Sequence, residues 1–105
     1  MDFQGKVVVV TGGGSGIGEA AARGFAARNA AVAVVDRNAE AGGKIASELK
    51  QKGGKAKSFS ADVSSTAQVE QLIPQIVSEF GGIDVLVNCA GIQRYGTVTS
   101  LSEAE

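Results

Sequence analysis

A run of glycines is the first feature of this sequence that could bind a ligand. Thr11 to Gly18 reads Thr-Gly-Gly-Gly-Ser-Gly-Ile-Gly, after a β-branched run and before an alanine-rich segment. A strand, a glycine turn and a helix N-terminus together make an anion site, because N–H groups point outward and missing Cβ atoms let a phosphate approach. The alternative is a tight turn that needs glycine only for its dihedral angles.

The spacing within this run limits the kind of phosphate site. A P-loop needs a lysine after its last glycine, but Glu19 follows Gly18. The strict G-x-G-x-x-G spacing is also missing, and the run instead contains Thr-Gly-x-x-x-Gly-x-Gly. The candidate pyrophosphate-binding residues are Gly12, Ser15, Gly16, Ile17 and Gly18.

Asp36 is the second candidate ligand-binding residue. It ends the second predicted strand, near the offset at which a carboxylate accepts hydrogen bonds from the ribose hydroxyls of adenosine. The adjacent Arg37 could hold a ribose 2′-phosphate, but Asp36 would repel that phosphate. The pair therefore favours NAD over NADP, with Arg37 as a solvated side chain over the adenine edge.

Two further strand ends complete the candidate site. Asp62-Val63 follows the third predicted strand, where an adenine ring would rest; the alternative is a turn aspartate before a helix cap at Ser65. Asn88-Cys89-Ala90-Gly91 follows the fourth, beside the point where the winding of the sheet reverses and ligands bind. The candidates here are Asp62, Val63, Asn88, Ala90 and Gly91, whereas Cys89 is expected to be a small buried filler.

These motifs together resemble the short-chain dehydrogenase/reductase family, in order and spacing over nearly the whole chain. The resemblance implies an NAD(P)-dependent oxidoreductase that acts on an alcohol or carbonyl substrate and forms homo-oligomers. The family motif is usually Asn-Asn-Ala-Gly, so Cys89 departs from it, and Asn88 matches a residue that mainly ties the central strands together.

The resemblance also identifies catalytic residues that this chain lacks. The family uses an Asn, a Ser and a Tyr-x-x-x-Lys pair, in which the lysine lowers the pKa of the tyrosine. The only tyrosine here is Tyr95, and Thr99 stands where the lysine would be. We therefore assign no catalytic residue.

The spacing of apolar residues predicts the elements that position these motifs. Strands are expected over 6–11, 31–36, 56–61 and 83–88, and helices over 16–29 and 38–52, followed by a third helix whose apolar residues cover 69–80. The third helix has one continuous apolar face, a capping box over 65–68 and a kink at Pro74. The alternation predicts a Rossmann-type, doubly wound parallel α/β sheet, first half only, with strand order 3-2-1-4.

The composition of the chain limits the partners, metal sites and disulfides that can be expected. The net charge of −1 gives no reason to expect a nucleic-acid or membrane partner, and no signal peptide is visible, so a cytoplasmic location is expected. With no histidine and one cysteine, neither a metal site nor a disulfide is expected within the chain.

The last residues suggest a partial domain. Ser102 to Glu105 has the pattern of a capping box that opens a helix, which predicts that 1–105 is a partial NAD-binding domain truncated before the catalytic segment. A polar tail on a small complete protein is the alternative. Two rival functions are a methyltransferase that binds S-adenosylmethionine and a non-enzymatic nucleotide-binding module.

Overall fold

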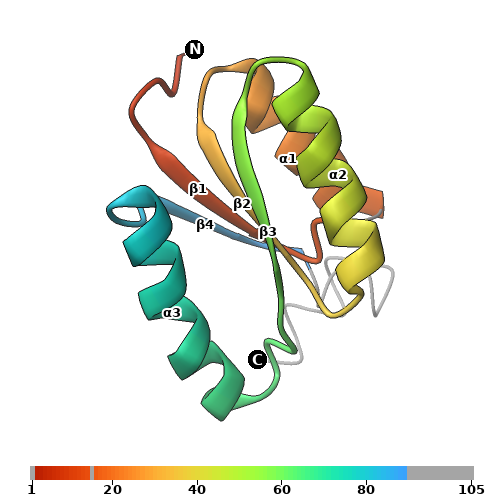
Figure 1. Cartoon of the computed structure of the whole chain (residues 1–105), viewed down its shortest axis with the longest axis vertical. Helices are drawn as coiled ribbons and strands as arrows, with labels where there is room; N and C mark the ends of the chain where they lie inside the picture. Colours follow the sequence, from red (N-terminus) through yellow and green to blue (C-terminus); the bar gives the residue numbers. More distant parts are fainter. Residues whose placement is uncertain (1, 15, 90–105) are drawn as a thin grey trace, which may run out of the picture.

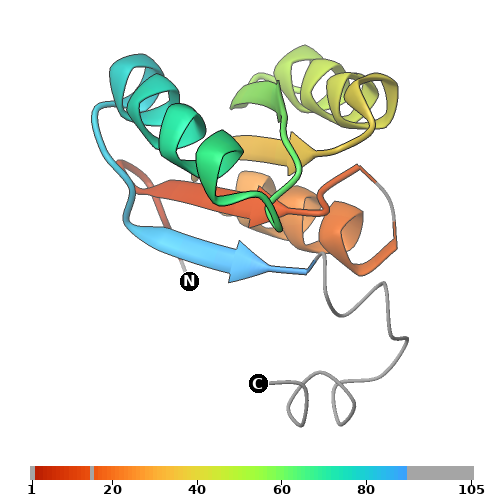
Figure 2. The same ribbon diagram turned by 90° about the horizontal axis from the view of Figure 1, so that it is seen from below.

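The strands and helices alternate along the chain as predicted. The computed structural model describes residues 2–14 and 16–89. The elements of this part are β1 (Val7–Thr11), α1 (Gly16–Ala27), β2 (Ala31–Asp36), α2 (Ala39–Gln51), β3 (Lys55–Ser60), α3 (Thr66–Phe80) and β4 (Val85–Asn88). The strands pair in parallel in the order β3-β2-β1-β4, visible as stacked arrows in Figure 2. The predicted strand order is therefore confirmed.

The central strands form because their residues suit a sheet buried on both faces. β1 reads Val-Val-Val-Val-Thr and every one of its residues is buried, and the middle four residues of β2 are buried as well. β-Branched side chains pack well on a pleated surface, and a near-continuous apolar run is typical of a covered parallel strand. The sheet therefore has its core at β1 and β2.

Helices cover both faces of the sheet (Figure 1). α1 and α2 lie on one face, and α3 lies on the other. The chain moves outward from β1 to β3 and then crosses back to β4, so right-handed connections place α3 opposite α1 and α2. The buried cores of the two faces are Val8, Val10, Ala22, Ala30, Val32, Val34, Ile45, Ala46, Leu49, Ala56 and Cys89 under α1 and α2, and Val9, Ala33, Val35, Ala61, Leu72 and Ile76 under α3.

The ends of α1 and α2 differ slightly from the prediction. α1 ends at Ala27, before the predicted end at Asn29, because Asn29 has a left-handed backbone with a φ of 73°. The Asn38 side chain caps α2 by accepting from the N–H of Ala41 at 3.1 Å. α2 continues as a helix through Gly42 and Gly43. Gly42 is buried against β2, since a Cβ on Gly42 would lie 3.5 Å from the Cβ of Asp36.

α3 forms only half of its predicted capping box. The Ser65 side chain accepts from the N–H of Gln68 at 3.3 Å, but the Gln68 side chain accepts from the N–H of Asp62 at 2.8 Å instead of bonding back to Ser65. The helix continues through Pro74, which is exposed, so solvent can reach the carbonyl that loses its donor. Leu72 and Ile76 are its buried apolar residues.

β4 is shorter and less covered than predicted. It begins at Val85, and Leu86 is 65% exposed, so the expected cover on both faces is absent from the described part of the chain. β4 pairs with β1 alone among the described strands. At its start the Asp84 carboxylate accepts from the N–H of Val7 at 2.8 Å, which fixes the register of the two strands.

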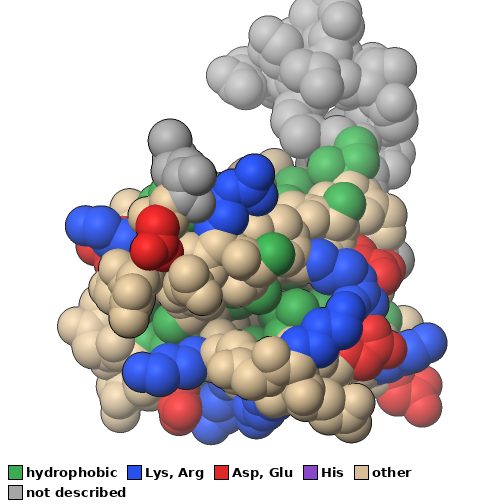
Figure 3. Space-filling model, turned by 90° about the horizontal axis from the view of Figure 1, so that it is seen from above, with side chains coloured by type: hydrophobic (Ala, Val, Ile, Leu, Met, Phe, Trp, Pro, Cys, Tyr) green, Lys and Arg blue, Asp and Glu red, His purple; other side chains and the backbone are tan. Residues whose placement is uncertain are grey.

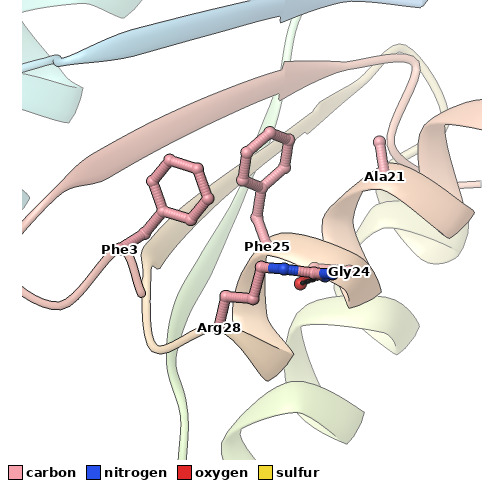
Figure 4. A pocket seen from close by; sticks show the side chains of 5 residues that line it. All are labelled: Phe3, Ala21, Gly24, Phe25 and Arg28. Atoms are coloured by element: carbon pink, nitrogen blue, oxygen red, sulfur yellow. Dashed lines mark hydrogen bonds between the residues drawn. The ribbon is translucent and has the colours of Figure 1, made fainter. Parts of the chain in front are cut away.

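The segment before β1 is attached to α1 by aromatic packing. The rings of Phe3 and Phe25 lie edge to face with their centroids 5.2 Å apart. Figure 4 shows both rings beside a shallow apolar pocket that Ala21, Gly24 and Arg28 also line. This contact holds the amino-terminal segment against the helix that follows the glycine turn.

Candidate nucleotide-binding site

The strand ends bring the predicted site residues to one edge of the sheet. Thr11 lies opposite Val35 in β2 and opposite Asn88 in β4, and Asp36 lies opposite Ser60 in β3. Because the strands are parallel, all of these residues lie at carboxyl ends. The glycine turn between β1 and α1 lies at the same edge.

Two glycines of the turn are required by backbone conformation. Gly12 and Gly16 have φ angles of 67° and 62°, in the left-handed region that side chains rarely adopt. Between them, the N–H of Gly13 donates to the carbonyl of Val35 at 3.1 Å, which anchors the turn to β2. The turn then leads into α1, whose first N–H groups have no partner within the helix and carry the positive end of its dipole.

Gly18 is required by space. A Cβ at this position would lie 1.9 Å from the carbonyl oxygen of Gly12 and 3.0 Å from the Cα of Gly13. The first turn of α1 is therefore packed directly on the glycine turn. Ile17, beside it, is 53% exposed and points away from the core.

The Asp36 carboxylate is hydrogen-bonded on both oxygens. Oδ2 accepts from the N–H of Gly14 at 2.9 Å, and Oδ1 accepts from the N–H of Asn38 at 2.9 Å. Each carboxylate oxygen has capacity for a further hydrogen bond, so both can still accept from a ligand hydroxyl. The partner Gly14 was not among the predicted site residues. A third consecutive glycine, which the Thr-Gly-x-x-x-Gly-x-Gly spacing does not need, is a sequence feature that could have suggested a role for Gly14.

Asp62 has the hydrogen bonds of a turn aspartate. Its Oδ1 accepts from the N–H of Ser64 at 3.0 Å and from the Ser64 hydroxyl at 2.7 Å. Val63, the next residue, is partly buried against the core under α3. The turn therefore fixes both residues just beyond the carboxyl end of β3.

Asn88 ties β4 to β1. The Thr11 hydroxyl donates to its side-chain oxygen at 2.9 Å, and the N–H of Cys89 donates to the Thr11 hydroxyl at 3.2 Å. The Cys89 side chain is 2% exposed, and burial raises the pKa of its thiol, as expected of a filler and not of a reactive thiol. The remaining predicted residues Ser15, Ala90 and Gly91, together with Tyr95, Thr99 and 102–105, lie outside the described residues.

The amino ends of the strands, opposite the candidate site, carry several lysine side chains. A hollow at the amino ends of the strands is lined by residues that include Lys6, Lys52 and Lys55. Figure 3 views this end and shows lysine and arginine side chains, with acidic side chains beside them, around apolar patches. Among the described residues, no helix has the length and apolar character needed to cross a bilayer.

The order of the strands and the position of the glycine turn define a class of protein. A parallel sheet in the order β3-β2-β1-β4, with a glycine turn leading into the first helix, is a Rossmann-type fold. The helix start that follows the glycine turn and the carboxylate at the end of β2 suit an adenine dinucleotide.

Comparison with known proteins identifies the family. The family described as short chain dehydrogenase matches residues 6–105. The chain is 44% identical over 103 residues to the 2,3-dihydro-2,3-dihydroxybenzoate dehydrogenase of Bacillus subtilis, covering 98% of this chain and 40% of that protein. The chain therefore belongs to the short-chain dehydrogenase family, and its relatives are oxidoreductases.

Solved structures of this family share the fold. A hydroxysteroid dehydrogenase from Escherichia coli superposes with a TM-score of 0.80 at 37% identity, over 83% of this chain and 37% of that one. A D-mannonate oxidoreductase of Haemophilus influenza, described as putative and solved with bound NAD, gives 0.78 at 33% identity over 81% and 30%. The comparisons give no support to the methyltransferase or to the non-enzymatic alternative. The chain spans less than half the length of these proteins.

Proposed function

We propose that these 105 residues are the cofactor-binding portion of a longer, NAD-preferring oxidoreductase that acts on an alcohol or carbonyl substrate. Asp36 carries this proposal. Its carboxylate lies at the end of β2 and is fixed by hydrogen bonds from Gly14 and Asn38, beside the turn that would hold the pyrophosphate. A fixed carboxylate there is suited to the two ribose hydroxyls of NAD and would repel the 2′-phosphate of NADP.

Each predicted residue has a role in holding the cofactor. We assign the pyrophosphate to Gly12, Ser15, Gly16, Ile17 and Gly18, the adenine to Asp62 and Val63, and the floor beneath the nicotinamide end to Asn88, Ala90 and Gly91. The N–H groups of Gly13 and Gly14 already bond Val35 and Asp36. The start of α1 is therefore the better donor for the pyrophosphate.

The bound nicotinamide would exchange a hydride with the substrate. The described residues do not carry the proton transfer that accompanies it, and we assign that step to residues outside this chain. We further propose a homo-oligomeric protein in the cytoplasm, with no nucleic-acid or membrane partner.

The test is cofactor selectivity in the full-length protein. Hydrogen bonds from ribose to the charged Asp36 are worth about 1.5–3 kcal/mol, or roughly ten- to a hundredfold in binding. We expect kcat/KM for NAD to exceed that for NADP by at least about tenfold, and Asp36→Ala to narrow the gap. Equal values for the two cofactors in the wild-type protein would reject the assignment and favour a 2′-phosphate role for Arg37.

A further inference from the structure

We propose that Gly14 is a positioning residue that sets the orientation of the Asp36 carboxylate, and through it the preference for NAD over NADP. This inference rests on the proposed function. It adds a specificity-determining position outside the three glycines of the Thr-Gly-x-x-x-Gly-x-Gly spacing.

The first observation is the hydrogen bond between the two residues. The Gly14 N–H lies 2.9 Å from Asp36 Oδ2, and this bond joins residues far apart in sequence. The other oxygen is held by the N–H of Asn38, whose own side chain caps α2. The carboxylate is thus held between the glycine turn and the first turn of α2, and neither oxygen can turn away without losing a bond.

The second observation is the space around Gly14. A Cβ on this residue would lie 2.8 Å from Asp36 Oδ2, 2.8 Å from the Cβ of Ala41 and 3.0 Å from the backbone nitrogen of Gly42. Two of these neighbours belong to α2, which is itself packed on β2, so they have little freedom to move. A side chain at position 14 would therefore displace the carboxylate, and it would also press on the start of α2.

These observations join two parts of the cofactor site. Gly14 belongs to the turn that leads to the pyrophosphate site, and Asp36 belongs to the ribose site. A carboxylate displaced by a side chain would keep its charge near the ribose but lose its alignment with the two hydroxyls. Because NAD depends on that alignment and NADP does not, the loss should fall mainly on NAD.

The experiment measures equilibrium binding of NAD and NADP to the full-length protein by calorimetric titration, with Gly14→Ala, Gly14→Val and a matched control. The control is Gly43→Ala in α2, where a Cβ would meet only the Ser58 hydroxyl, at 3.8 Å. Gly14→Val should weaken NAD at least about tenfold and NADP less than about threefold, as expected for a lost charge-assisted bond. Gly14→Ala should lie between Gly14→Val and wild type, and Gly43→Ala should match wild type.

A double-mutant cycle tests whether the effect passes through Asp36. In an Asp36→Ala background, Gly14→Val should change the ratio of NAD affinity to NADP affinity by less than about twofold, because the carboxylate is gone and the remaining contacts with α2 affect both cofactors alike. An equal loss for NAD and NADP in both backgrounds would show that Gly14 acts on the pyrophosphate instead, and would overturn the inference. Unchanged selectivity in folded Gly14→Val would also overturn it. If the wild-type protein itself binds NAD and NADP equally, the proposed preference for NAD is wrong, whatever the Gly14 variants show.

A measurement on the unsubstituted position covers the case in which Gly14→Val does not fold. The amide proton of Gly14 should exchange slowly with solvent in hydrogen-exchange NMR of the wild-type protein, and faster in Asp36→Ala, which removes the acceptor. A Gly14 amide that exchanges equally fast in the two folded proteins would contradict the hydrogen bond and the inference with it.

Discussion

Glycines in the turn between β1 and α1 serve two different physical purposes. Gly12 and Gly16 provide left-handed backbone, whereas Gly18 and Gly14 provide room for neighbouring atoms. A substitution at the first kind strains the turn itself. A side chain at Gly14 or Gly18 would force apart two segments that are in contact. The effect of such a substitution therefore depends on the role of the neighbouring segment.

Gly18→Ala should destroy the turn. The added Cβ would lie 1.9 Å from the carbonyl oxygen of Gly12, a contact that only movement of α1 away from the turn can relieve. We expect loss of measurable NAD binding by the full-length protein in titration. The matched control is Gly24→Ala in α1, where a Cβ meets no atom within 4 Å, and it should bind normally. Normal NAD affinity in a folded Gly18→Ala protein would contradict the packing described.

Cys89 should react slowly with thiol reagents. Its side chain is 2% exposed and burial raises its pKa, so at any given pH it has less reactive thiolate than an exposed cysteine. The rate of maleimide labelling in folded protein should stay low at neutral pH and rise as the pH increases. Labelling at the rate of the denatured protein at neutral pH would contradict this account.

At the scale of elements, α1 and α2 are joined by a charged cluster that sequence periodicity did not reveal. Arg23 in α1 bonds Glu19 one turn earlier at 3.0 Å and also bonds Glu48 in α2. The hydrogen bond from Arg23 lowers the pKa of Glu48, and the two carboxylates raise the pKa of Arg23. The pair holds together the two helices that flank the glycine turn.

Arg23→Gln should lower the melting temperature of the full-length protein slightly at low salt. All three side chains are about one-third exposed, so the pair is screened and worth little in 1 M salt, where the Debye length falls to about 3 Å. Because the pKa of Glu48 is lowered in the folded state, its contribution is present at neutral pH and lost as the pH falls through that lowered value. A melting-temperature difference that does not change with salt or acid would contradict the pairing.

Much of this arrangement could be read from the sequence because it depends on local patterns. The β-branched runs predicted β1 and β2, Asn38 predicted the start of α2, and the glycine turn and Asp36 were predicted to lie at one sheet edge, as the structure has them. The spacing in sequence did not show that Gly14 bonds Asp36, because that contact depends on how closely α2 approaches the turn. The pattern over 65–68 likewise did not show that the Gln68 side chain accepts from the N–H of Asp62 instead of completing the capping box.

At the scale of the whole molecule, β4 is a poorly covered edge strand of the described sheet. Leu86 is 65% exposed, and β4 has one strand neighbour among the described residues. The chain matches 40% of the length of the Bacillus subtilis dehydrogenase. We propose that the rest of a longer protein would cover β4.

Expressed alone, the 105-residue chain should aggregate or pack loosely and show no dehydrogenase activity. Among the described residues β4 has no strand on its outer side, so its N–H and C=O groups there are open to pairing with other chains, and the sequence has no Tyr-x-x-x-Lys pair. Size-exclusion chromatography, a thermal melt and an NAD-linked alcohol oxidation assay test this. A soluble monomer with a sharp cooperative melt would contradict the structural part, and alcohol oxidation by the purified chain would contradict the chemical part.

The most direct test of the central claim is a crystal structure of the full-length protein with NAD bound. We predict both adenosine ribose hydroxyls within about 2.5–3.2 Å of the Asp36 carboxylate, and the pyrophosphate at the N–H groups that begin α1. Gly14 should keep its hydrogen bond to Asp36 Oδ2 in that complex. An adenosine bound away from the end of β2, or a pyrophosphate away from the glycine turn, would contradict the account.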